Sequence, residues 1–386
     1  MNRNVATGKH PVATGIGRQL MADLSSLGFI SGDSHINEPR DLWKANLPSA
    51  MRDQAMQGIV AGDDGNWSLI MDSGRVNKSP DEEELRILST SYEHRTKVMR
   101  EEGVLGECIY PTIGLFVWML TDADAGAASC RVYNEWIAEQ LAHSPRFKCA
   151  GLVPTWRIED AVAEVHRIKA ANLGAVMLPA VATPDWNHRQ WEPLWAAIEE
   201  TGLPCVMHQG TGHSMYFYRG PGAGVSNLLA TQSMGARAAA LLATSGTLEY
   251  HPDLHFVFVE FNAGWLGWTM QTLDFYTDAF SAYGTTEQGK QWINPELPEK
   301  PSFYLRRQVH CTFQDDPVGI NNIGMTGAGP LIWGSDYPHE EGTYPHSRST
   351  VAQLAAGLDD VSAADVFRNN AARLFNFSDE VLNTPV

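Results

Sequence analysis

The stretch GFISGDSHINEPRDLW, residues 28–43, decides the fold, because a short apolar run inside it ends abruptly in polar residues. Residues 28–35 close with Asp33 and His35, which is typical of a buried β-strand that ends at a site. Side chains two positions apart on a strand point to the same face, as two ligands of one metal ion must. A lone Asp-x-His pair also arises by chance, so the metal-binding interpretation depends on residues elsewhere in the chain.

Seven further runs of the same kind follow at residues 104–111, 148–155, 174–180, 203–210, 254–261, 307–314 and 330–337. Between them lie helical patterns with apolar residues three and four apart, for example IEDAVAEVHRIKAAN and QWEPLWAAIEETG. Strands that alternate with helices predict a parallel sheet, and eight such units favour an α/β fold of the closed (β/α)8 TIM-barrel type. No Gly-x-Gly-x-x-Gly follows the first run, which argues against an open dinucleotide-binding sheet.

We expect one barrel domain over residues 28–386, with residues 44–93 as an insertion after the first strand and helices at the C-terminal end. Residues 1–27 are polar and lack the apolar core of a secretory signal, so we expect an N-terminal arm rather than an export sequence. The five cysteines are widely spaced and form neither a disulfide framework nor a Cys-x-x-Cys metal site. These features predict a cytoplasmic protein.

The charge of the chain limits its partners. The 386 residues include 28 Lys+Arg against 45 Asp+Glu, a formal net charge of −17. Such a surplus repels the phosphates of nucleic acids and anionic lipids. No apolar run approaches the roughly 18 residues that a membrane span needs. We therefore expect no nucleic-acid partner and no membrane partner.

Polar residues end other predicted strands, where a barrel places its active site. The fifth run ends at His208, which a hydrogen bond at the barrel rim would also explain. The eighth run leads into WGSDYP with Asp336, which could instead cap a helix. Imidazole and carboxylate ligands suit divalent zinc, iron or manganese. Four candidate ligands would converge on the barrel axis from strands one, five and eight: Asp33, His35, His208 and Asp336.

A series of motifs runs through the chain in order: GDSHINEPRDLW, EEGVLGECIYPT, NEWIAEQ, RFKCAGLVP, LPCVMHQGTG, HPDLHFVFVE, AGWLGW, WGSDYPH and NNAARLF. This pattern resembles the amidohydrolase-related family of the amidohydrolase superfamily. That family includes the aminocarboxymuconate-semialdehyde, resorcylate and carboxyvanillate decarboxylases. The resemblance implies a distorted barrel and a metal held by the four candidate ligands, but it does not fix the reaction.

The chain departs from the decarboxylase pattern after HPDL. Glu260 stands where those enzymes carry a catalytic histidine, and an ionised glutamate would repel a substrate carboxylate unless a cation lies between them. Glu260 could be a structural residue, a general base beside one metal, or a ligand of a second metal. In the last role it would replace the bridging lysine of other superfamily members, because the strand GAVMLPA has no Lys. The Asp-x-His start, this Glu and WGSDYPHEEGTYPHS also resemble a branch of dinuclear non-haem iron oxygenases.

Further polar residues lie beyond the predicted ligands. His213 and His339 could each complete a second metal site or orient a ligand from outside, although a solvated loop histidine is the alternative. His310 shares strand parity with two polar neighbours and could face the barrel axis, although a packed core histidine explains it as well. Arg40 could clamp a substrate carboxylate through its planar fork, or it could lie on the surface.

Three functions remain open for a chain with one or two divalent metals. Our first choice is a monooxygenase that hydroxylates a small organic acid at a dinuclear centre with Glu260 as a ligand, using electrons from a separate reductase. The alternative is decarboxylation or hydrolysis at a single metal, with Asp336 or Glu260 as the catalytic group. The third is a non-catalytic subunit that partners an active homologue. In each case we expect a homo- or hetero-oligomer.

Overall fold

The structure is a computed structural model that describes residues 28–39, 41–53, 59–61, 67–71, 74–78, 89–214, 217–281 and 295–386. The predicted N-terminal arm, residues 1–27, lies outside the described residues, and so does Arg40. Among the described residues, no helix combines the length and the apolar character that crossing a lipid bilayer would require.

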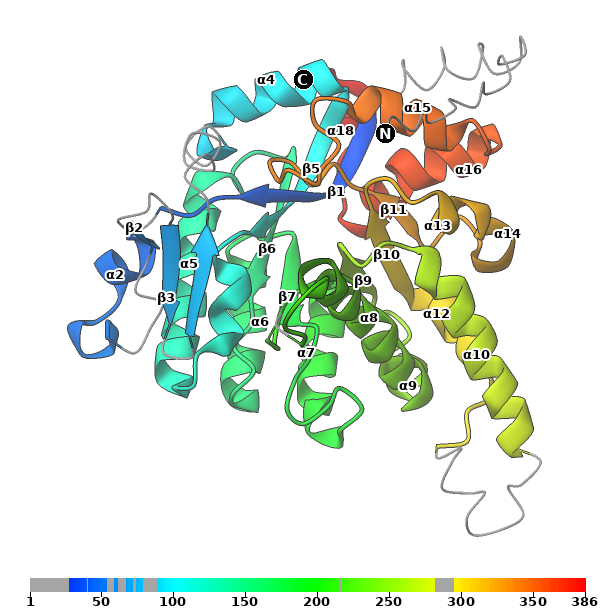
Figure 1. The fold of residues 1–386 in the computed structure, drawn as a ribbon, viewed down its shortest axis with the longest axis horizontal. Helices are drawn as coiled ribbons and strands as arrows, with labels where there is room; N and C mark the ends of the chain where they lie inside the picture. The colour runs from blue at the N-terminus through cyan, green and yellow to red at the C-terminus, as the bar shows by residue number, and fades with distance from the viewer. Residues whose placement is uncertain are drawn as a thin grey trace.

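Eight parallel strands form one sheet, which confirms the predicted barrel class (Figure 1). The strands are β1 Phe29–Ile36, β5 Val104–Pro111, β6 Phe147–Leu152, β7 Ala175–Pro179, β8 Cys205–His208, β9 Phe256–Val259, β10 Val309–Phe313 and β11 Leu331–Trp333. Each barrel strand pairs with the next barrel strand along the chain, so the strands follow one another around the barrel in sequence order. Each predicted run overlaps its strand: β5 matches its run, β1 and β6 begin or end one residue outside theirs, and the other five lie within theirs.

A narrow seam between β1 and β11 nearly closes the barrel. The seam consists of one parallel bridge between Ser34 and Tyr337 and two main-chain hydrogen bonds. The His35 N–H donates to the Tyr337 carbonyl over 2.6 Å, and the Asp336 N–H donates to the Asp33 carbonyl over 2.8 Å. Because three of these residues are predicted ligands, the closure of the barrel also sets their positions.

Helices cover the outside of the sheet (Figure 1). They are α2 Leu42–Asn46, α4 Tyr92–Glu102, α5 Ala123–Gln140, α6 Ile158–Ala170, α7 Glu192–Thr201, α8 Ala223–Thr244, α9 Thr247–Tyr250, α10 Gly264–Ser281, α12 Pro301–Gln308, α13 Pro317–Asn321, α14 Ile323–Thr326, α15 Ser347–Ala355, α16 Asp360–Ala364, α17 Asn370–Leu374 and α18 Asp379–Asn383. In α6, Ala161, Val165 and Ile168 recur at helical spacing and are buried against the sheet side. Asp122 caps α5 by accepting from the Ala125 N–H over 2.8 Å.

The predicted insertion, residues 44–93, holds a small antiparallel sheet between β1 and α4. Its strands are β2 Ile59–Ala61, β3 Trp67–Met71 and β4 Gly74–Lys78, in the order β2-β3-β4. This sheet is separate from the eight-stranded sheet and precedes the second barrel strand in the chain.

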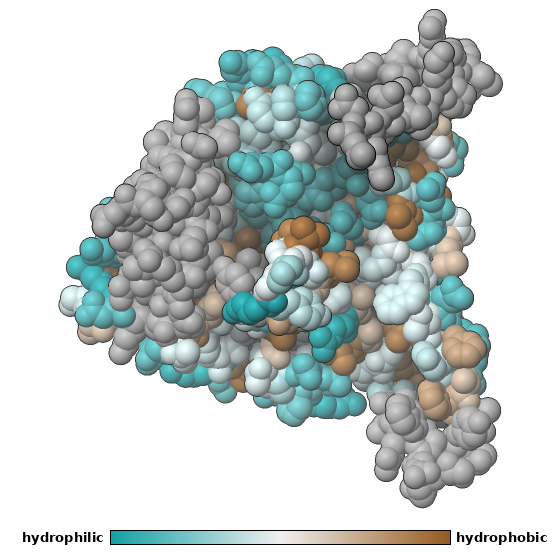
Figure 2. All heavy atoms as spheres, in the orientation of Figure 1, coloured by the Kyte–Doolittle hydropathy of each residue, from teal (hydrophilic) through white to brown (hydrophobic). Residues whose placement is uncertain are grey.

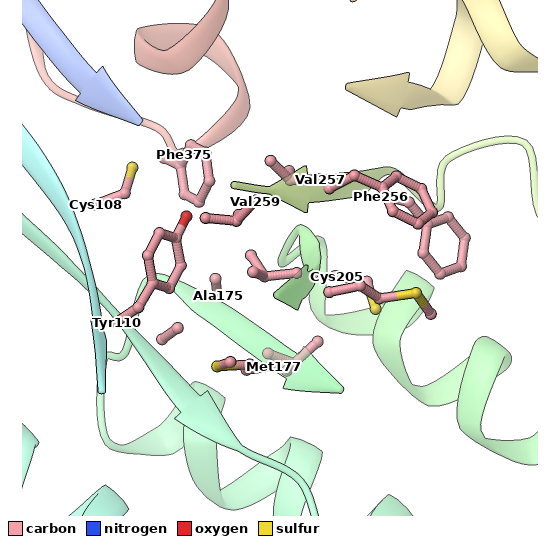
Figure 3. Close-up of a cluster of buried hydrophobic side chains, with 14 of the residues drawn as sticks. Cys108, Tyr110, Ala175, Met177, Cys205, Phe256, Val257, Val259 and Phe375 are labelled. Carbon is pink, nitrogen blue, oxygen red and sulfur yellow. The ribbon is translucent and has the colours of Figure 1, made fainter. Parts of the chain in front are cut away.

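The barrel interior is a packed apolar core rather than a pore (Figure 3). Tyr110, Met177, Cys205 and Val259 come from four different strands and meet in this cluster. All five cysteines are buried free thiols, as their spacing predicts. The core therefore holds the strands in register, and the polar ligands can gather only at a strand end.

The visible surface is largely hydrophilic, with hydrophobic residues gathered over α8 and α10 (Figure 2). Val225 and Leu229 of α8 and Phe275 of α10 are exposed there. A mostly apolar cavity of 560 Å³ lies between these helices, with Trp265 and Trp268 in its lining. None of the predicted metal ligands lines it.

Candidate metal centre

Five predicted site residues meet at the carboxyl ends of the barrel strands. Asp33 and His35 lie on β1, His208 ends β8, Glu260 directly follows β9, and Asp336 follows β11. All are fully buried except Glu260, whose side chain is 10% exposed. Strands that are far apart in the sequence thus deliver carboxylates and imidazoles to one place, as the barrel topology requires.

The Nε2 atom of His35 lies at the centre of this group. It is 2.9 Å from Glu260 Oε1, 3.5 Å from Asp33 Oδ1 and 3.6 Å from Asp336 Oδ1. The second imidazole is equally close, since His208 Nε2 lies 3.1 Å from His35 Nε2 and 3.2 Å from Glu260 Oε1. For metal–ligand bonds of about 2.1 Å, adjacent ligand atoms of an octahedral ion lie about 3 Å apart, so these spacings fit one.

Main-chain carbonyls fix the orientation of both rings. The Nδ1 atom of His35 lies 2.8 Å from the Pro111 carbonyl, and that of His208 lies 2.9 Å from the Gln209 carbonyl. A carbonyl only accepts, so each Nδ1 carries a proton and each neutral ring presents a lone pair on Nε2. Two lone pairs that face each other are unfavourable unless a cation lies between them. The tautomer with its proton on Nδ1 and a free lone pair on Nε2 is one that metal-binding histidines adopt.

Several buried oxygens in the group lack a hydrogen-bond donor. Asp33 Oδ1 and both carboxylate oxygens of Asp336 accept no hydrogen bond within the described part of the chain. His339 Nδ1 does lie 2.9 Å from Asp336 Oδ1, but the angle lies outside the range of a hydrogen bond. Burying unpaired carboxylate oxygens is costly, and metal coordination is the usual compensation. The residues present therefore fit a divalent metal ion.

The ionisation of the group reflects its crowding. Burial raises the pKa of Asp336 well above its ordinary value, and the charges of Glu260 and Asp33 add to this effect. Burial also favours the neutral form of Glu260, but the surrounding imidazoles outweigh it and hold its pKa well below the ordinary range. For His35, burial and His339 oppose the charged form, yet hydrogen bonds to Asp33 and Glu260 raise its pKa to about 9. The raised pKa values of Asp336 and His35 make the bare cluster less negative, as a bound cation would.

Two of the site carboxylates lie on left-handed backbone. Glu260 has φ 63° and Asp336 has φ 55°, a conformation that non-glycine residues seldom adopt. Each costs on the order of 1–3 kcal/mol and persists only where the surrounding structure enforces it, most often at functional sites. The bends let both side chains turn toward the axis directly after their strands.

One hydroxyl group ties two of these carboxylate residues together. Thr312 Oγ1 accepts from the Glu260 N–H over 3.0 Å and donates to Asp33 Oδ2 over 3.3 Å. Gln314 Nε2 reaches the same Asp33 oxygen over 3.5 Å. The sequence contains the signal for this contact, because Thr312 on β10 and Gln314 just after it are two residues apart and share one side of the chain.

The four residues predicted beyond the main ligands, His213, His339, His310 and Arg40, do not share one place in the structure. His339 joins the site, where its Nδ1 atom lies 3.6 Å from Glu260 Oε1 and its ring centre lies 4.1 Å from that of His35. His213 is half-buried, lies 3.0 Å from the Ser214 carbonyl through Nδ1, and belongs to neither group of potential ligands among the described residues.

The structure does not bring His310 to the metal site, and its buried position agrees with the alternative of a packed core histidine. His310 lies near the start of β10, opposite Val257 of β9, and therefore near the amino end of the barrel. Its partners are the His255 ring and the Gly329 carbonyl. Strand parity predicted the correct face but could not predict the depth along the axis.

Glu38, which shares the opening stretch with Arg40, has a structural position. Its carboxylate accepts from the main-chain N–H groups of Ile113 and Gly114 over 2.9 and 2.8 Å. It thereby fixes the turn after β5 next to the site. Arg40 lies outside the described residues, so its predicted contact with substrate stays a prediction.

Comparisons with known proteins concern the family and the fold of the chain. A family model described as "Amidohydrolase" matches residues 37–377. The match includes His208, Glu260 and Asp336, whereas Asp33 and His35 lie just before it begins. No curated protein sequence matches the chain.

Solved structures share the fold at low sequence identity. An amidohydrolase from Mycobacterium avium subsp. paratuberculosis K-10 is 19% identical, with a TM-score of 0.74 over 90% of this chain and 97% of that chain. The 5-carboxyvanillate decarboxylase from Sphingomonas paucimobilis is 19% identical, with a TM-score of 0.65 over 91% and 100%. A dihydroxybenzoic acid decarboxylase from Polaromonas sp. JS666, with bound manganese and 2-nitroresorcinol, is 18% identical, with a TM-score of 0.64 over 92% and 99%. At these identities the likeness shows a common fold.

Proposed function

Because the chain belongs to the amidohydrolase family, we propose that it is a metal-dependent enzyme that removes a carboxyl group from a small organic acid. Solved relatives of similar fold include decarboxylases of 5-carboxyvanillate and of dihydroxybenzoic acid. Fold alone does not determine a reaction, so the proposal depends on what the site residues can do.

The metal would be held by four ligands that the sequence already predicts: Asp33, His35, His208 and Asp336. Side-chain atoms of the other three lie within 3.6 Å of His35 Nε2. Manganese, iron and zinc all accept this mixture of carboxylate and imidazole. A divalent cation bound there would supply a Lewis acid that binds substrate oxygens and stabilises negative charge. The buried position of the ligands limits access of water to the substrate.

The position of His339 is the observation that carries the proposal. Loss of carbon dioxide leaves an electron pair on carbon, which a general acid must protonate. Glu260 replaces the histidine that related decarboxylases carry after this strand, but His339 brings an imidazole to within 3.6 Å of Glu260 from another loop. With Nδ1 beside Asp336, its Nε2 atom is buried and makes no hydrogen bond to any described residue. His339 Nε2 is therefore the proton donor we assign.

The test uses protein loaded with Mn²⁺ and freed of oxygen. It is offered 2,6-dihydroxybenzoate, 5-carboxyvanillate and a panel of related acids, and released carbon dioxide is measured. We expect His339→Asn to lower kcat by about 100-fold or more while metal content is kept, since general acid catalysis contributes about 10²–10⁴. His166→Asn, an exposed change on α6, should match the unmodified protein. Turnover only in the presence of dioxygen, or full activity in His339→Asn, would overturn the proposal.

Hydroxylation at two metals is the second candidate, and Glu260 is the observation that favours it. Its Oε1 atom lies 2.9, 3.2 and 3.6 Å from three imidazole nitrogens, so it belongs to both four-residue groups of potential ligands. Three site carboxylates with neutral histidines carry −3, so one divalent ion gives 2 − 3 = −1, whereas two give 4 − 3 = +1. An acid substrate would bind better at a positive site.

Metal content separates the two candidates. Close to two metal ions per chain, with dioxygen consumed in proportion to product when a reductase supplies electrons, would support hydroxylation. About one ion per chain with oxygen-independent release of carbon dioxide would exclude it. Turnover of either kind would also exclude a non-catalytic subunit.

A further inference from the structure

A second cluster of charged side chains lies at the opposite end of the barrel. It surrounds a pocket of 360 Å³, within the range of about 300–1,000 Å³ typical of small-molecule sites. The charged and imidazole residues in its lining are Asp253, His255, Arg306, Arg307, His310 and Arg373. His255 directly precedes β9 and Arg307 lies on α12 just before β10, so the pocket is at the amino ends of strands whose carboxyl ends carry the metal ligands.

The pocket is positive although the protein is strongly acidic. Its three arginines and one aspartate give 3 − 1 = +2 with neutral histidines, in a chain with a net charge of −17. Within the described residues, no carboxylate forms an ion pair with any of the three guanidinium groups. Positive groups gathered in a concave site without acidic partners attract an anion.

Two of the arginines are held in place and keep unused donors. Arg373 Nη2 donates to Asn370 Oδ1 over 2.9 Å, which leaves Nε and Nη1 without an acceptor among the described residues. Arg307 packs over the rings of Phe303 and Tyr304, at 5.1 and 5.4 Å, and donates through Nε and Nη2. Arg307 Nη1 likewise has no acceptor among the described residues. A fixed guanidinium loses little entropy when it binds an oxyanion.

A pair of histidines adds a third group. The Gly329 carbonyl lies 3.2 Å from His310 Nδ1, so this nitrogen carries the proton and Nε2 accepts from His255 Nδ1 over 3.1 Å. The Nε2 atom of His255 then has no partner among the described residues. Burial lowers the pKa of His255, Asp253 opposes this effect, and the charges of Arg373 and Arg307 lower the pKa further, so a bound anion would favour the protonated ring.

We propose that this pocket is a binding site for a small oxyanion, either inorganic phosphate or a compact carboxylate. The shared chemistry is a group with two or more anionic oxygens, which Arg307 and Arg373 can contact through separate N–H donors. Since the site lies away from the metal ligands, the anion stabilises the folded chain rather than reacting. The inference does not depend on which reaction the metal site performs.

The test measures the thermal midpoint of the full chain in increasing sodium phosphate, with sodium chloride at matched ionic strength as the reference. Malonate forms a second series, which separates carboxylate from phosphate as the preferred source. We expect one of the two anions to raise the midpoint at millimolar concentration. Arg373→Gln and Arg307→Gln should each lower the affinity for that anion by about tenfold or more, because each removes a charge-assisted hydrogen bond.

The charge-matched control is Lys97→Gln, an exposed residue on α4 that should bind the anion as the unmodified protein does. Circular dichroism of each variant without anion shows whether it folds. Equal midpoint shifts in chloride, phosphate and malonate would overturn the proposal. So would unchanged anion affinity in both folded arginine variants. Neither result affects the proposed decarboxylation, which carbon dioxide release measures separately.

Discussion

Arg95 Nε donates to Glu107 Oε2 over 2.6 Å, and the two side chains are 0% and 2% exposed. Arg95 Nη1 also donates to the main-chain carbonyl of His35 over 2.8 Å, and Ser34 Oγ donates to Glu107 Oε1 over 3.2 Å. This buried ion pair therefore holds β1 from both sides at its metal-ligating end. The ion pair supports the metal ligands through the main chain and Ser34, and it contacts no ligating side-chain atom.

We expect Arg95→Met to lower the free energy of unfolding by about 3–5 kcal/mol, because it leaves Glu107 buried without its cation. Urea titration followed by circular dichroism measures the change. As a control, Arg157→Gln removes a half-exposed arginine that pairs with Asp124 over 2.7 Å, and it should barely move the urea midpoint. Similar losses in both variants would show that burial of the Arg95 pair has no special importance.

Gly334 brings two strands together at the metal site. A Cβ atom on Gly334 would overlap Asp33 Cβ, so Gly334→Ala must displace this ligand or its strand. Overpacking of this kind costs about 1–3 kcal/mol, and we expect metal affinity to fall by about tenfold. Competition with a chelating dye measures the affinity. Gly357→Ala, where an added Cβ meets nothing within 4 Å, should leave it unchanged, and an unaffected Gly334→Ala would contradict the geometry.

Removal of metal should destabilise the chain, because the unpaired oxygens of Asp33 and Asp336 lose their cation. At a free Mn²⁺ concentration of about 100 times Kd, binding adds about 2.7 kcal/mol to the free energy of unfolding, and EDTA reverses this. Differential scanning calorimetry follows the effect. Asp336→Asn should lose most of the Mn²⁺ response, whereas Glu200→Gln, an exposed change on α7, should keep it. A full response in Asp336→Asn would show that Asp336 is not a ligand.

The sequence predicts the barrel and most of the site because both depend on local patterns. An apolar run that ends in a polar residue marks a strand and its carboxyl end at once, as for His208. The barrel topology then brings such ends together without further information. Asp336 could have capped a helix, and only the seam with β1 distinguishes the two roles.

The remaining features depend on contacts that no local pattern contains. His213 and His339 both lie a few residues beyond a ligand, yet only His339 turns back to the cluster. Glu107 is a charged residue inside an apolar strand, which could have signalled a buried partner, but its identity as Arg95 follows from the packing of α4. The same limit explains why strand parity left the depth of His310 along the barrel axis open.

The buried histidine pair predicts how stability depends on pH. Burial, helped by repulsion from His255 and Arg373, lowers the pKa of His310 from 6.5 to about 3. Between these values the unfolded chain binds a proton that the folded chain excludes, so stability is complete above pH 6.5 and decreases as the pH falls toward 3.

This one group contributes a slope of at most about 1.4 kcal/mol per pH unit, and His310→Gln should remove it. Urea titrations in phosphate-free buffer between pH 7 and pH 4 measure the slope, with the exposed His166→Gln on α6 as the control that keeps it. His310→Gln costs some stability at pH 7 through its lost contacts, so the comparison is between slopes rather than midpoints. If its slope equals that of the unmodified protein, His310 takes up its proton in the folded chain. Water must then reach the His310 ring in the pocket.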